Sequence, residues 1–184
     1  VMAIVVIMFY FKSGFNFDSN AKLLKIAAYV WILLNAILVI STMVKNTEYV
    51  YHFGLTYKRL GVYAFLTLSL LGLAFTWYKI SAKKTNVFLF NTMIWSVYGM
   101  ILVCSWLNWG GIITQYNLKQ SHFDLNYLLN EVHLNEKDLL DYAKKHDNKS
   151  LENEVVHKIK SKQRSQFLSK VLYYETVRFQ EHSK

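Results

Sequence analysis

Glu48 and His52 are the pair of side chains in this sequence whose types and spacing could do acid–base chemistry. A carboxylate and an imidazole can exchange a proton near neutral pH when they come within hydrogen-bond reach. The two residues are four positions apart, so a helix would place both on one face. Because the same spacing is common in helices that catalyse nothing, the pair is only a candidate catalytic site, and the sequence favours a chain that is not an enzyme.

A candidate anion-binding site follows at Thr56, Lys58 and Arg59. Thr56 is a plausible N-cap, and the two cations then lie in the first turn of a helix. Cations at this end oppose the helix dipole at a cost of about 0.3–1 kcal/mol each, so we expect an external anion to compensate them. A lipid phosphate is the interpretation we favour over a specific anionic substrate or an acidic patch on a partner.

Neither a cofactor nor a metal is expected from the sequence. Cys104 is the single cysteine, which excludes a disulfide framework and a thiolate metal site within the chain. The six histidines all lie outside the long uncharged stretches, which excludes a haem held by two histidines between membrane helices. The net charge of +9 does not indicate nucleic-acid binding, because the basic residues form no single face and gather at the ends of apolar segments, where they match phospholipid headgroups.

The elements that must position these residues are predicted to be all-α. Segments 22–45, 58–80 and 86–107 are each long and apolar enough to cross about 30 Å of hydrocarbon, which takes about 20 helical residues. Residues 1–11 are apolar but too few to span, and we interpret them as the end of a helix that begins upstream, after an unknown number of earlier spans. The sequence therefore predicts a polytopic membrane bundle over residues 1–107 and an extramembrane helical tail over residues 108–184.

Polar and small residues within the predicted spans are expected to pack the helices against one another. These spans contain no charged residue well inside them, so they carry no sign of a proton relay or ion path. Asn35 and Asn91 are expected to form interhelical hydrogen bonds of about 1 kcal/mol, with substrate contact as the less favoured alternative. The small residues that would allow close helix packing are Ser69, Gly72, Ser96 and Gly99.

The tail reads as short amphipathic helices joined by polar residues. One is expected over residues 123–132, a second after an Asn135 cap to about residue 146, and a longer one after a Ser150 cap toward residue 179, with a break near residues 160–165. Its last part offers a candidate surface for the preceding tail helices or a partner subunit, or else for the membrane, formed by Phe167, Leu168, Val171 and Leu172. The distribution of basic residues leans toward a tail on the non-cytoplasmic side.

Several short elements of this sequence resemble a known family. They are the run from Glu48 to Tyr63 that contains Gly54-Leu55-Thr56, then Lys83-Lys84-Thr85-Asn86, Asn108-Trp109, Tyr116-Asn117-Leu118 and Asp124 to Leu128. Over residues 46–140 the chain is similar to a bacterial family of multi-pass membrane proteins catalogued as domain of unknown function 4173. A related uncharacterised family shares the Gly-Leu-Thr element. The resemblance implies a longer bacterial inner-membrane protein with more spans before residue 1, and it implies no activity.

The functional hypothesis is a non-catalytic scaffold or accessory subunit of a larger bacterial membrane complex, whose tail docks a partner. Its expected partners are the phospholipid bilayer and other membrane subunits. The first alternative is the C-terminal part of a transporter or channel whose working residues lie upstream. The second is an enzyme at the membrane interface that acts on anionic or lipid-linked substrates through Glu48, His52, Lys58 and Arg59.

Overall fold

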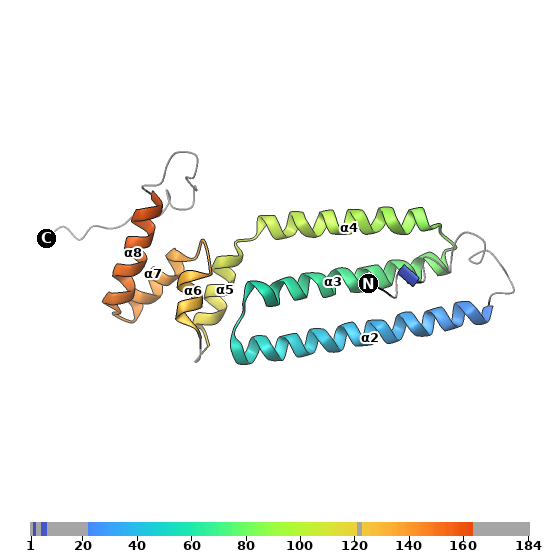
Figure 1. Ribbon diagram of the computed structural model, residues 1–184, viewed down its shortest axis with the longest axis horizontal. Helices are drawn as coiled ribbons and strands as arrows, with labels where there is room; N and C mark the ends of the chain where they lie inside the picture. Colours follow the sequence, from blue (N-terminus) through green and yellow to red (C-terminus); the bar gives the residue numbers. More distant parts are fainter. Residues whose placement is uncertain (1, 3–4, 7–21, 121–122, 164–184) are drawn as a thin grey trace. The chain divides into compact units, whose positions relative to one another are not determined.

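Helices make up the regular secondary structure of residues 2, 5–6, 22–120 and 123–163, which are the residues described by a computed structural model (Figure 1). The predicted all-helical class is confirmed for this part of the chain. The chain divides into two compact units. The first is Val1–His52 with Thr56–Leu107, and the second is Phe53–Leu55 with Asn108–Lys184.

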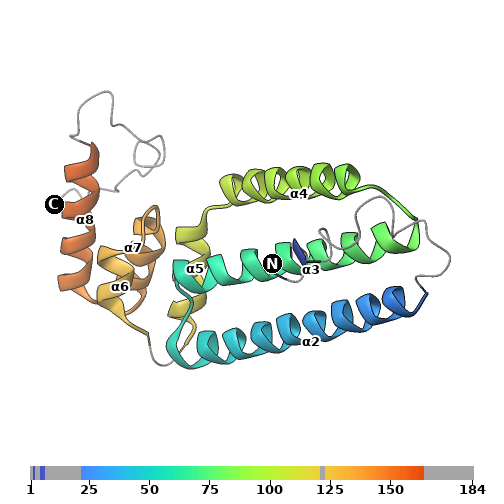
Figure 2. The same ribbon diagram turned by 45° about the vertical axis from the view of Figure 1, so that its right-hand side comes forward.

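Three long helices form the first unit: α2 (Lys22–Phe53), α3 (Tyr57–Ser81) and α4 (Asn86–Trp106). They run antiparallel and side by side (Figures 1 and 2). Each is long and apolar enough to cross a membrane. The prediction of three long apolar helices is therefore confirmed.

The buried core of the first unit is small. It combines one or two residues from each helix: Ala28, Ile32, Leu73, Ile80 and Leu89. Only 11%, 28% and 6% of the most apolar stretch of α2, α3 and α4, respectively, is buried. Most apolar side chains on these helices therefore face outward, which is the reverse of a water-soluble bundle with its apolar stripe turned inward.

Helix α2 is longer than predicted, because it ends at Phe53 and not near residue 45. Its last turns are held to α3 by Asn46, whose Nδ2 donates to the Arg59 carbonyl at 3.3 Å, and by Thr47, whose hydroxyl lies 2.7 Å from that of Tyr63. Gly54 follows with a φ of +79°, a left-handed conformation that ends helices. Hydropathy marked the end of the apolar stretch, whereas hydrogen bonds and a glycine decide where the helix stops.

The connection between α3 and α4 contains a buried cation. Lys79, in the last turn of α3, has a relative exposure of 0%. Its Nζ donates to Oδ1 of Asn86 at the start of α4. The short turn brings the Asn86 amide over the Lys79 side chain.

Short helices form the second unit: α5 (Trp109–Leu118), α6 (Leu125–Asn130), α7 (Glu136–Lys145) and α8 (Lys149–Gln163). Each contributes fully buried apolar side chains, among them Ile113, Leu128, Leu139, Val155 and Ile159. Helix α7 has acids in its first turn and lysines in its last, which complements its dipole.

Several bounds predicted for the tail need correction. Helix α6 is shorter than the expected 123–132, and α8 begins before Ser150. The cap of α8 is Asn148, whose Oδ1 accepts from the Leu151 amide at 3.2 Å. Residues 164–184, with the expected surface at Phe167, Leu168, Val171 and Leu172, lie outside the described residues, as do most of residues 1–11.

Candidate functional site

Asn117 fastens the loop between α2 and α3 into the second unit. Its Oδ1 accepts from the Leu55 amide at 2.7 Å, and its Nδ2 donates to the Leu55 carbonyl at 2.9 Å. These two hydrogen bonds are called the Asn117 clasp. Both residues are buried. A side-chain amide that satisfies both backbone groups of one residue imitates a strand partner, and the burial makes its loss costly. The tail unit is therefore built around a piece of chain that precedes α3 in the sequence.

Two glycines allow the helices of this unit to approach closely. A Cβ added at Gly110 would lie 1.8 Å from the carbonyl oxygen of His133. Asn108 caps α5 by accepting from the Gly111 amide at 3.2 Å, and its Nδ2 donates to the Leu134 carbonyl at 3.2 Å. The start of α5 is thus packed directly against the backbone that precedes α7.

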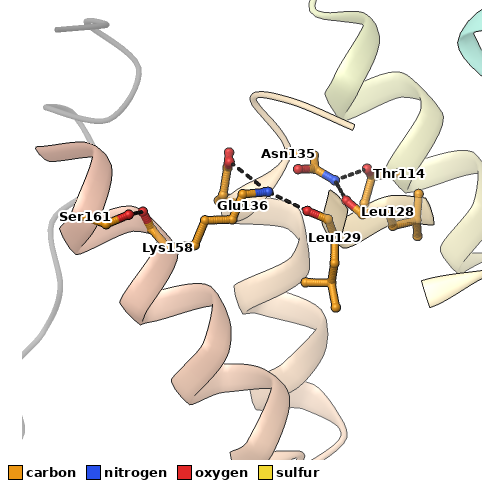
Figure 3. Close-up of polar contacts among 7 residues, drawn as sticks. All are labelled: Thr114, Leu128, Leu129, Asn135, Glu136, Lys158 and Ser161. Atoms are coloured by element: carbon orange, nitrogen blue, oxygen red, sulfur yellow. Dashed lines mark hydrogen bonds and ion pairs between the residues drawn. The ribbon is translucent and has the colours of Figure 1, made fainter. Parts of the chain in front are cut away.

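A buried polar network lies between α5, α6 and α7 (Figure 3). Asn135 is fully buried, and its Nδ2 donates to Thr114 Oγ1 at 2.9 Å and to the Leu128 carbonyl at 2.8 Å. The sequence predicted Asn135 as a helix cap. It does occupy the N-cap position of α7, but its side chain makes no cap hydrogen bond and turns into the core instead.

An ion pair holds α8 to this network. Nζ of Lys158 lies 3.6 Å from Oε1 of Glu136 and donates to the Leu129 carbonyl at 2.6 Å (Figure 3). The Glu136 side chain is fully buried, and the Lys158 side chain is 25% exposed. Because a buried carboxylate needs a cation or hydrogen-bond donors to offset its desolvation, Lys158 of α8 helps to stabilise Glu136 in α7.

An open groove of about 340 Å³ runs between α5 and α7. Gln115 Nε2 donates to Asp138 Oδ1 at 3.0 Å across it, and the rings of Tyr142 and His146 are in contact, tilted by 40° with centroids 4.3 Å apart. Both signs of charge line this groove, from Lys119, Asp138, Asp141 and Lys145. Such a surface suits ion pairs with a polar segment of another protein.

The candidate catalytic pair lies on the last two turns of α2. Glu48 and His52 are both exposed there. Neither lines the groove between α5 and α7. Their role as an acid–base couple stays a prediction.

The candidate anion site lies at the start of α3. Thr56 is the N-cap and accepts from the Arg59 amide at 3.4 Å. Lys58 is exposed and Arg59 is half-buried. The two cations therefore do occupy the first turn of a helix, and the anion that would compensate them stays a prediction.

The predicted packing residues have different surroundings. Ser69 and Gly72 are buried on α3, and Ser96 is half-buried on α4. Asn35 donates to the Trp31 carbonyl of its own helix at 2.8 Å, and Asn91 is exposed. A Cβ added at Gly99 would meet no atom within 4 Å. Contacts of Asn91 and Gly99 with further helices stay predictions.

Among residues 22–120 and 123–163, no three His, Cys, Asp or Glu side chains come together as possible metal ligands. The residues that sequence reasoning missed are instead the polar ones that organise the tail: Asn117, Glu136 and Lys158. Of these, only Asn117 lies in one of the short elements of the family resemblance, Tyr116-Asn117-Leu118. Glu136 and Lys158 read as ordinary surface charges until the fold brings them together.

The comparison with protein families bears on this arrangement. A family model described as Domain of unknown function (DUF4153) matches residues 1–141, which is more than half of the chain. This chain belongs to the DUF4153 family. No curated protein and no solved structure matches it. The DUF4153 match contains the Asn117 clasp and Asn135, and it ends inside α7, before Lys158.

The assignment to DUF4153 corrects the family named from sequence, which was 4173. That resemblance rested on short elements such as Gly54-Leu55-Thr56. These residues meet local requirements, a left-handed turn and a helix cap, that recur in many helical proteins. Short elements of this kind therefore indicate local structure better than they distinguish one family from another.

Proposed function

We propose that this DUF4153 chain is a non-catalytic, multi-pass component of a bacterial inner-membrane complex, and that its tail docks a partner protein. The observation that carries the membrane part is the outward orientation of the apolar side chains on α2, α3 and α4. Phe90, Trp95 and Ile101 of α4, for example, are 61%, 65% and 57% exposed. Water-soluble monomers rarely expose apolar patches larger than a few hundred Å², and acyl chains or neighbouring helices would solvate this surface.

The groove between α5 and α7 supports the docking part of the proposal. The tail unit around it is held together by the Asn117 clasp, the Asn135 hydrogen bonds and the Lys158–Glu136 ion pair. A preorganised surface loses little conformational entropy when it binds. The mixed charges along the groove select a partner of complementary pattern.

The test uses the full chain in its native membrane, cross-linked and then purified in detergent. We expect the chain to resist alkaline carbonate extraction and to carry a partner chain at fixed stoichiometry. Reversing the groove cations with Lys119→Glu and Lys145→Glu should abolish that association, because the ion pairs across the groove would become repulsive.

A matched control has the same change in net charge away from the groove, with Lys144→Glu and Lys149→Glu, both exposed residues. The control should keep the partner. Equal retention in both variants would contradict docking at the groove. Release of the unmodified chain by carbonate would contradict the membrane assignment itself.

A transporter or channel component is the second candidate, and one observation favours it. Lys79 is fully buried in the last turn of a helix that could span a membrane, where a buried cation could line the mouth of an ion path. Ion flux into proteoliposomes that is lost with Lys79→Gln and kept with Lys83→Gln would favour this candidate. Absence of flux with every monovalent ion tested would count against it.

A further inference from the structure

Helix α5 leaves part of its apolar surface outside the core of the tail unit. The face that it turns into the tail unit holds Ile113 together with Gly110, Thr114 and Asn117, all of them buried. Outside that face, Ile112 and Tyr116 are 41% and 37% exposed, beside the exposed Gln115 and the half-buried Trp109. Trp109, Ile112 and Tyr116 are separated by three and four positions, so they share one face of the helix. The face is called the Trp109–Ile112–Tyr116 face below.

Each end of α5 is tied to a chain segment next to a proposed span. At its start, only Leu107 and Asn108 separate it from the end of α4 at Trp106, which limits the distance from Trp106 to Trp109 to about 11 Å at about 3.6 Å per residue. At its other end, Asn117 holds Leu55, which lies between the last residue of α2 and the first residue of α3. Helix α5 is therefore fixed at both ends close to positions where spans end.

The two tether points belong to the same side of a bilayer. Helices α2, α3 and α4 follow one another, so if each spans, the connection between α2 and α3 and the end of α4 leave the bilayer together. A helix whose two ends are both tied to chain segments on that side is held within a short length of chain from that surface. Lying along that surface, its ten residues would extend about 15 Å.

We propose that α5 is an interfacial helix whose Trp109–Ile112–Tyr116 face inserts into the headgroup layer of the bilayer, an inference that rests on the proposed membrane function. The composition of α5 fits a lipid surface better than a protein partner. The helix carries no charge, and its outward face has a tryptophan and a tyrosine. The inserted face would fix the tail unit against the membrane.

The test places a fluorescent label at single cysteines of the full chain, reconstituted into vesicles of phosphatidylethanolamine and phosphatidylglycerol. In a Cys104→Ser background, the label is attached at Ile112→Cys or Tyr116→Cys. The matched controls are Asn126→Cys on α6 and Lys144→Cys on α7, both exposed positions of the same unit. Each sample is quenched first by a spin label carried on lipids and then by iodide in the water.

We expect the labels at positions 112 and 116 to emit at shorter wavelength than the controls and to lose most of their intensity to the lipid-borne quencher. The labels at positions 126 and 144 should respond to iodide alone. A label at position 112 that iodide quenches as strongly as at position 144 would overturn the proposal. So would protection from both quenchers, because the face would then be covered by protein, either a partner or a second copy.

Carbonate extraction of the same vesicles separates this inference from the proposed function. A chain that resists extraction but carries a water-exposed position 112 would refute the interfacial helix and leave the membrane assignment standing. A chain that carbonate removes would refute both.

Discussion

Single amides and glycines decide the structure of the tail unit. Asn117 and Asn135 each use a buried side-chain amide to hydrogen-bond backbone or hydroxyl groups of other segments. Gly110 lets a helix touch a neighbouring carbonyl. Such single residues form no recognisable sequence pattern. Their replacement should nevertheless lower the stability of the tail unit strongly, because the sites are buried and tightly packed.

Replacement of the Asn117 amide is the first prediction. Asn117→Ala should destabilise the tail unit by about 2–4 kcal/mol, because the buried amide and carbonyl of Leu55 would both lose their partner. Hydrogen–deuterium exchange of residues 54–56 in detergent measures the effect as faster exchange. Asn126→Ala, at an exposed position of α6, is the control and should leave this exchange unchanged. Equal rates in the two variants would show that the clasp contributes nothing.

A methyl group at Gly110 is the second prediction. Gly110→Ala should lower the free energy of unfolding by about 1–3 kcal/mol, because the new Cβ would overlap the His133 carbonyl and force the backbones apart. Gly61→Ala is the matched control on α3, where an added Cβ meets no atom within 4 Å and helix propensity improves. Thermal unfolding of the two variants in the same detergent should therefore move in opposite directions. A Gly110→Ala protein as stable as the unmodified chain would refute the close approach.

The helices of the two units are specified by different features of the sequence. Those of the first unit are specified by long apolar stretches, whereas in the second unit helix caps, charges that complement helix dipoles and the Lys158–Glu136 ion pair also contribute. Helix α8 illustrates the second unit, since it is held by its apolar face and by Lys158. Its attachment to α6 and α7 can be weakened without touching the spans.

Loss of the ion pair on α8 is the third prediction. Lys158→Met should weaken the attachment of α8 to the tail unit by about 1–3 kcal/mol. The buried carboxylate of Glu136 would lose its cation, and the Leu129 carbonyl would lose its donor. Faster amide exchange across residues 149–163 is the measurement. The double variant Glu136→Gln with Lys158→Met should recover part of this loss, because a neutral amide costs less to bury than a carboxylate. A double variant with the summed cost of both single changes would show that the two side chains do not interact.

For the whole molecule, the proposed crossing of the membrane by α2, α3 and α4 in succession fixes which connections share a side. The fourth prediction follows from that order. In a Cys104→Ser background, a thiol at Lys83, between α3 and α4, should react with a membrane-impermeant reagent from the side opposite to a thiol at Asn126 in the tail. Labelling of intact cells and of inverted vesicles measures this directly. Reaction of both thiols from one side would mean that α4 does not cross the bilayer.

The same measurement tests the sidedness that basic residues suggest. With the tail on the non-cytoplasmic side, the thiol at Asn126 should react in cells whose outer membrane has been permeabilised, and the thiol at Lys83 only in inverted vesicles. The opposite pattern would refute the proposed sidedness and keep the order of spans intact.

The long helices could be predicted from sequence because a membrane span needs only composition and length. The runs within α2, α3 and α4 each satisfy that requirement without reference to any other segment. Helix caps could also be predicted from sequence, because a cap depends only on nearby residues. Thr56, for example, accepts from the amide of Arg59, three residues away. The cap of α8 was misplaced by two residues, because Asn148 and Ser150 are both good caps and the sequence does not distinguish them.

What the sequence determined by itself is the helical class, the three apolar helices and the uncharged interior of each. The tertiary structure alone decided that α2 extends to Phe53, that the Gly54–Leu55 loop is part of the tail unit, that Lys79 is buried and that Glu136 meets Lys158. The physical reason is the distance along the chain over which each requirement acts. Hydropathy and capping act within one or two helical turns, whereas Leu55 and Asn117 are 62 residues apart and only packing brings them together.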